Sequence, residues 1–120
     1  MAEFDPELIV MQAASTEPDT KMIEVLMGDV LRMAHAGDSA MHIGSAEYTF
    51  GWNFCIMSVD KMVARRLAQL PESGILGVKG SSLEEKFVGW LNRQAKANGA
   101  DDRIHFSLLS DLKSSRYGLF

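Results

Sequence analysis

The predicted fold class depends mainly on the secondary structure of residues 46–56, which read AEYTFGWNFCI. Bulky side chains alternate there with smaller or polar ones, which is the period of a strand with one buried face. Apolar residues also fall at helical spacing, but Thr, Gly, Asn and the aromatic residues are poor helix formers. We therefore predict a strand over residues 46–56, paired with a preceding strand over residues 40–43 through a turn at Gly44-Ser45. A single helix over residues 46–70 is the alternative.

Start and stop signals outside this segment predict four helices. Asp5-Pro6-Glu7 is typical of a helix start, because Asp caps, Pro suits the first helical position and Glu favours the positive end of the helix dipole. A second apolar run keeps the helical period over four turns and ends at Gly37, and the residues from Ser82 to Glu85 form a capping box. The four predicted helices cover residues 6–15, 18–36, 58–70 and 82–98.

Residues 103–109 alternate apolar and polar side chains and predict a C-terminal strand. The predicted architecture is one α+β domain over residues 1–120, with about four helices and a small antiparallel sheet around residues 46–56. An all-α bundle is the alternative, and it follows if the central segment is helical.

The composition excludes several classes of protein. The chain has 120 residues, of which 16 are acidic and 12 basic, and its one cysteine cannot form an internal disulfide. No apolar run approaches the roughly 20 residues that span a membrane, and the N-terminus lacks the basic and apolar regions of a signal peptide. A sequence pI of about 5.3 disfavours nucleic-acid binding, which is typical of domains with a pI above about 9. We expect an intracellular, cytoplasmic protein that binds no membrane.

Charges and apolar residues are unevenly distributed along the chain. Residues 1–47 contain nine acidic and two basic residues, whereas residues 48–120 contain seven acidic and ten basic residues. All eight methionines lie at or before Met62, and nine of the ten aromatic residues lie at or after Tyr48. This polarity suits a surface that binds other proteins or further copies of the chain. The alternative is that the acidic and basic halves pack against each other within one domain, so that their charges partly cancel.

The sequence contains few candidates for catalysis or metal binding. His35, Asp38 and His42 have ligand-type side chains, but they are spread over a helix end and a turn and do not form the tetrahedral set that zinc requires. Cys55 lies in an apolar segment, where burial raises the pKa of a thiol and makes it inert. Nothing local supports its pairing with His42 or His105 as a catalytic base. We therefore predict no metal, no cofactor and no enzymatic activity.

The segment from Gly74 to Ser82 is the strongest candidate for binding a small ligand. It places Lys79 and several glycines ahead of a helix start, where backbone N–H groups can hold a phosphate or carboxylate. It is not a P-loop, because Lys79 precedes Gly80 instead of following it, and an ordinary capped connector has the same composition. The candidate anion-binding residues are Lys79, Gly80, Ser81 and Ser82. A possible nucleic-acid face, which the pI disfavours, consists of Lys61, Arg65, Arg66, Arg93 and Lys96.

The C-terminus ends in large apolar side chains, which either pack on the protein's own core or bind a partner. The predicted partner-binding residues are Arg116, Tyr117, Leu119, Phe120, Met22 and Met33. We predict a small acidic protein that binds another protein, as an adaptor, chaperone or inhibitor like those of bacteria and phages, or that assembles into an oligomer. The alternatives are a structural subunit of a larger assembly, such as a virion connector, and an enzyme or an anion or nucleotide binder that uses residues 74–82.

Overall fold

The computed structural model describes residues 8–16, 20–100 and 103–110, and the elements named below lie within these ranges. The strands are β1 (Leu8–Thr16), β2 (Met41–Thr49), β3 (Trp52–Asp60) and β4 (Ile104–Leu108). The α-helices are α1 (Thr20–Met33), α2 (Lys61–Ala68) and α3 (Leu83–Ala97). Short 3-10 turns cover Asp38–Ala40, Pro71–Ser73 and Ile75–Gly77.

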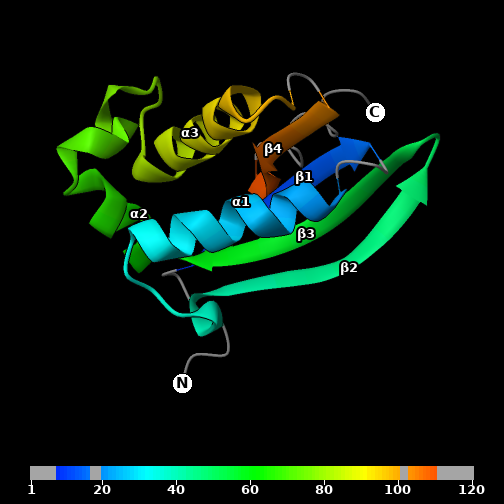
Figure 1. The fold of residues 1–120 in the computed structure, drawn as a ribbon, viewed down its shortest axis with the longest axis horizontal. Coiled ribbons are helices and arrows are strands. Elements are labelled where there is room, and N and C mark those ends of the chain that lie inside the picture. The colour runs from blue at the N-terminus through cyan, green and yellow to red at the C-terminus, as the bar shows by residue number, and fades with distance from the viewer. Residues whose placement is uncertain (1–7, 17–19, 101–102, 111–120) are drawn as a thin grey trace.

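The four strands form one antiparallel sheet in the order β2-β3-β1-β4. β1 lies inside the sheet, where Met11 is opposite Met57 of β3 on one side and Leu108 of β4 on the other. In chain order the elements read β-α-β-β-α-β, with α2 and α3 together in the second crossover, which is the ferredoxin-like arrangement. Figure 1 shows α1 crossing over the sheet and the β2–β3 hairpin extending beyond the helices. This topology decides which residues share a face, but it does not identify a function.

One face of the sheet carries the hydrophobic core. Successive side chains of a strand point to opposite faces, so every second residue of β1 is buried, including Ile9, Met11 and Ala13. The helices cover this face with their apolar sides, and α3 contributes the buried Trp90 and Phe87. The opposite side of the sheet is called the outer face here. Its residues are Leu8, Val10, Gln12, Ala14 and Thr16 of β1, Trp52, Phe54, Ile56, Ser58 and Asp60 of β3, His42, Glu47 and Thr49 of β2, and His105 and Ser107 of β4.

The prediction of four helices is wrong, and so is the all-α alternative. The described residues contain three α-helices and a four-stranded sheet, and the segment predicted as a helix over residues 6–15 forms the inner strand β1. Leu8 to Met11 is a continuous apolar run, which fits an inner strand as well as it fits a helix, and its β-branched residues favour the strand. The sheet is also larger than predicted, because it joins strands from the beginning, centre and end of the chain.

Residues 46–56 are extended, but they do not form the single predicted strand. They contain the hairpin turn at Phe50-Gly51, so β2 ends at Thr49 and β3 begins at Trp52. The predicted turn at Gly44-Ser45 is instead an irregularity inside β2, between Ile43 and Ala46. A Cβ on Gly44 would lie 3.0 Å from the Ile56 carbonyl oxygen, so glycine permits a close backbone approach there and does not reverse the chain.

Candidate functional site

The tip of the β2–β3 hairpin carries the most exposed large apolar side chain among the described residues. Phe50 is 97% exposed, and Tyr48, which precedes it by two residues on β2, is 58% exposed. The hairpin tip is defined here as Tyr48, Thr49, Phe50 and Gly51. Single exposed apolar residues are common on proteins, so exposure alone does not identify a site. The backbone conformation of Phe50 adds a second and independent observation.

Phe50 adopts a left-handed backbone conformation that bulky residues rarely occupy. Its φ is 53°, and the φ of Gly51 is 84°. Positive values at both central residues are those of the two-residue hairpin turn in which Asn-Gly is the preferred pair. A non-glycine residue in such a conformation costs on the order of 1–3 kcal/mol. Phe50 therefore strains the turn, while its exposed ring buries almost nothing in return.

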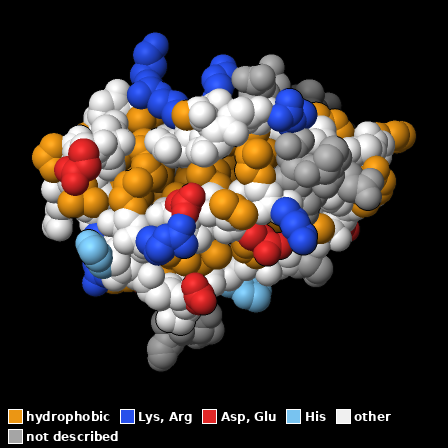
Figure 2. Space-filling model, in the orientation of Figure 1, with side chains coloured by type: hydrophobic (Ala, Val, Ile, Leu, Met, Phe, Trp, Pro, Cys, Tyr) orange, Lys and Arg blue, Asp and Glu red, His pale blue; other side chains and the backbone are white. Residues whose placement is uncertain are grey.

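The hairpin tip extends beyond the helices, as Figure 1 shows. Figure 2 shows hydrophobic side chains at the end of the molecule where the hairpin turns in Figure 1. Residues 41–60 include two acidic residues, Glu47 and Asp60, and no Lys or Arg. Next to the tip, a shallow depression is lined by Gln12, Ala46, Glu47, Phe54, Cys55 and Ile56. The tip is thus an apolar projection with an acidic residue at its base.

The outer face of the sheet is a second candidate surface. Ile56 is 42% exposed and Leu8 is 38% exposed, and the half-buried Val10, Phe54 and Trp52 lie on the same face. Among the described residues, this face includes no Lys or Arg, and its charged residues are Glu47 and Asp60. No described helix packs on it, because the helices contribute to the core on the opposite side. The sequence analysis predicted neither surface, because it placed Phe50 inside a single strand and predicted a helix over residues 6–15, most of which form β1.

Cys55 has the environment of a structural thiol. It lies opposite Ala13 in the β1–β3 pairing and is partly exposed. Burial raises the pKa of the thiol above its ordinary value, and a hydrogen bond with the backbone of Ala13 offsets part of this effect. Because the thiolate is the nucleophilic form, a raised pKa makes the side chain unreactive at neutral pH.

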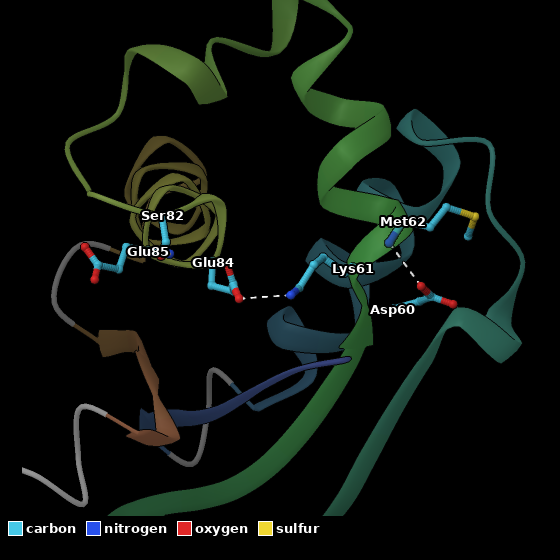
Figure 3. Close-up of polar contacts among 6 residues, drawn as sticks. All are labelled: Asp60, Lys61, Met62, Ser82, Glu84 and Glu85. Carbon is cyan, nitrogen blue, oxygen red and sulfur yellow. Dashed lines mark hydrogen bonds and ion pairs between the residues drawn. The ribbon is translucent and has the colours of Figure 1, made fainter. Parts of the chain in front are cut away.

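In the predicted anion-binding segment, Ser81 and Ser82 already form hydrogen bonds with Glu85. Ser81 donates its backbone N–H to Oε1 of Glu85 at 2.9 Å and its hydroxyl to the same oxygen at 3.2 Å. Ser82 caps α3, because its Oγ accepts the Glu85 N–H at 3.2 Å. Lys79 and Gly80 are exposed beside them. The carboxylate of Glu85 thus occupies the position that a bound anion would take, and Figure 3 shows Ser82, Glu84 and Glu85 around this helix start.

Two members of the predicted basic face join elements of the fold. Lys61 lies 3.1 Å from the carboxylate of Glu84 and connects the start of α2 with the start of α3, as Figure 3 shows. The pKa of Glu84 lies below its ordinary value, first because of a hydrogen bond with its own backbone and then because of Lys61. Arg66 donates to the carbonyl oxygens of Ala34 at 3.2 Å and His35 at 2.7 Å, at the end of α1. Both side chains are therefore already paired with other groups of the same chain.

The other predicted residues lie apart from one another. His35 follows the end of α1 with a φ of 54°, His42 lies on β2, and the described residues contain no group of three His, Cys, Asp or Glu side chains that could hold a metal ion. Met22 packs against the core, and Met33 is 40% exposed on α1. The predicted partner-binding residues Arg116, Tyr117, Leu119 and Phe120 lie outside the described residues.

No protein-family model, no curated protein and no solved structure matches this chain. Within the described part of the chain, every helix is too short or too polar to cross a membrane.

Proposed function

We propose that this protein is a non-catalytic binding protein that contacts a partner protein through the hairpin tip. The observation that carries the proposal is the strained conformation of the almost fully exposed Phe50. Strained residues cluster at functional sites, where the surrounding structure maintains them. An aromatic ring that contributes little to folding is well suited to anchor in a partner's pocket, since aromatic residues dominate the binding energy of many protein interfaces.

The charges near the hairpin tip favour a protein partner over a lipid surface or a nucleic acid. Nucleic acids are polyanionic and anionic membranes carry a negative surface potential, so binding to either is favoured by Lys and Arg residues near the contact. Residues 41–60 contain no Lys or Arg, and Glu47 lies three positions before Phe50. A pocket with an apolar floor and a basic rim matches this arrangement. Burying the Phe50 ring in such a pocket contributes about 1.5–3 kcal/mol to binding.

The hairpin also presents Phe50 at a low entropic cost. β2 and β3 pair in register up to Thr49 and Trp52, so the turn is held at the end of a paired ladder. Ordering a loop on binding opposes association, and a turn that is already ordered avoids most of this cost. We therefore expect the contact to depend on the one side chain and to involve little rearrangement of the backbone.

Site-specific photo-cross-linking in the native host tests this proposal. A photoreactive phenylalanine analogue replaces Phe50 in one variant and Leu76 in a control variant, because Leu76 is also exposed but lies in the 3-10 turn Ile75–Gly77. We expect one discrete cross-linked protein from position 50, suppressed by excess unlabelled wild-type protein, and none from position 76. The same products from both positions, or no product from position 50, would contradict the proposal.

A further inference from the structure

We infer that two copies of this chain pack the outer faces of their sheets together, around a two-fold axis that runs parallel to the strands between β1 and β3. This inference uses a different surface from the hairpin tip and goes beyond the proposed function. It rests on the order of side chains across the outer face, on the polar side chains at its two edges and on its size.

The strand register arranges the outer-face side chains in rows across the sheet. Glu47 of β2 is opposite Phe54 of β3, Phe54 is opposite Ala14 of β1, and Ala14 is opposite His105 of β4. In the neighbouring rows, Trp52 is opposite Thr16 and Ile56 is opposite Gln12. The large apolar side chains of this central part of the face therefore lie along β3, and smaller or polar ones lie beside them along β1.

A two-fold axis parallel to the strands makes this arrangement complementary to itself. The rotation places β3 of one copy over β1 of the other, so Phe54 faces Ala14 of the second copy. By the same rotation Trp52 faces Thr16 and Ile56 faces Gln12. A ridge of large side chains then fits over a row of smaller ones, as in the interdigitated interiors of packed sheets. An axis perpendicular to the strands would instead bring the two β3 ridges together.

The same rotation pairs polar side chains at the edges, a carboxylate with an imidazole that can donate a hydrogen bond to it. It brings β2 of one copy over β4 of the other, so Glu47 faces His105 of the second copy, once on each side of the axis. Packed sheets cross at about 30°, which shifts the edge residues by roughly one position and leaves this order unchanged. The described outer face contains no Lys or Arg that the second copy would have to bury.

The size of the face agrees with a specific but modest interface. Three nine-residue strands about 30 Å long and the five-residue β4, each about 4.8 Å wide, give a flat footprint of roughly 500 Å². The relief of the side chains raises the accessible area toward the 600–1,000 Å² or so that each partner buries in a standard interface. We therefore expect a dimer that forms at micromolar to millimolar protein concentrations.

Sedimentation equilibrium tests whether the dimer forms through this face. We expect wild-type protein to reach twice the monomer mass of 13.3 kDa as concentration rises. Ile56→Arg places a charge near the axis and should leave a monomer with an unchanged circular dichroism spectrum. Val25→Arg is the matched control, because Val25 is 63% exposed on α1, on the opposite side of the sheet, and should not affect the dimer. A wild-type monomer at every concentration, or a folded Ile56→Arg dimer, would overturn the inference.

Cross-linking between two differently substituted chains tests the axis without relying on Ile56→Arg. In a Cys55→Ser background, Glu47→Cys and His105→Cys proteins are mixed and treated with a short bismaleimide. We expect a covalent dimer from the mixture and none from either protein alone. Equal products from the single proteins, or none from the mixture, would overturn this axis.

Two other occupants of the outer face give distinct results. If residues 117–120 cover it within one chain, the wild-type protein is a monomer, and removing those residues changes its tryptophan fluorescence. If a different protein covers it, the wild-type protein is a monomer that this truncation does not affect. Either result overturns the inference and leaves the proposed role of Phe50 intact, because the hairpin tip is a separate surface from the outer face.

Discussion

The side-chain amide of Asn92 binds both backbone polar groups of Phe106. Its Oδ1 accepts the Phe106 N–H at 2.8 Å, and its Nδ2 donates to the Phe106 carbonyl oxygen at 3.0 Å. Asn92 belongs to α3, and Phe106 is the buried centre of β4. β1 pairs with one side of β4, so this amide acts at the other side as a neighbouring strand would. The contact attaches the end of the chain to the helical layer and occupies part of a sheet edge that could otherwise pair with another chain.

Asn92→Ala should destabilise the protein by about 1–3 kcal/mol, because it leaves two partly buried backbone groups without their partners. Thermal unfolding measures the loss. The control is Asn98→Ala, which removes an exposed hydrogen bond of 2.7 Å from Nδ2 to the Gln94 carbonyl oxygen and should have a smaller effect. Equal melting temperatures for the two variants would show that the contact with Phe106 contributes nothing specific.

The ion pair between Lys61 and Glu84 should stabilise the protein only when Glu84 is ionised. Folding lowers the pKa of Glu84, so its contribution is present above the unfolded-state pKa, near 4.5, and is lost as the pH falls through the lower folded-state pKa. Lys61→Met should therefore cost about 0.5 kcal/mol at neutral pH, given the partial exposure of the pair. In urea titrations, the difference in unfolding free energy between Lys61→Met and wild type should shrink as the pH falls below about 4.5.

The control for this pair is Lys79→Met, which removes the same charge from an exposed position in the loop before α3. It should have little effect on unfolding at any pH. If Lys61→Met lowers the unfolding free energy by the same amount at neutral and acidic pH, the loss comes from packing of the lysine side chain and not from the ionised Glu84.

Cys55 should react slowly with iodoacetamide at neutral pH. Burial raises the pKa of its thiol, so the thiolate fraction is smaller than in an unfolded peptide. The rate should rise steeply toward alkaline pH and after unfolding in urea. A comparison protein with Ser39→Cys in a Cys55→Ser background has its cysteine at an exposed position and should react faster. A faster reaction at Cys55 would indicate an activated thiol and reopen the question of catalysis.

The sequence predicts the elements of this fold best where local signals are complete. The capping residue Ser82 and the apolar spacing after it predict a helix over residues 82–98, and α3 covers Leu83–Ala97. The spacing over residues 18–36 predicts a helix where α1 covers Thr20–Met33. Both helices bury one face against the sheet, so their periodicity remains visible in the sequence.

Prediction fails where long-range pairing decides the structure. Residues 8–16 lie between β3 and β4, and only these distant strands make the extended conformation favourable over a helix. The hairpin turn is hidden for a different reason, because Phe50 continues the alternation of bulky residues through a turn that usually contains Asn or Gly. Gly51 after Phe50 is the signal in the sequence that could have indicated the turn. The exposure of the Phe50 side chain follows only once the turn is placed there.

We propose that Phe50 serves binding and weakens the fold. Thermal unfolding of Phe50→Asn separates these two effects, because Asn is preferred in the left-handed position ahead of Gly51. We expect the substitution to stabilise the protein by about 1 kcal/mol, or about 4 °C in melting temperature. A melting temperature below that of wild type would show that Phe50 supports the fold, and it would contradict the claim.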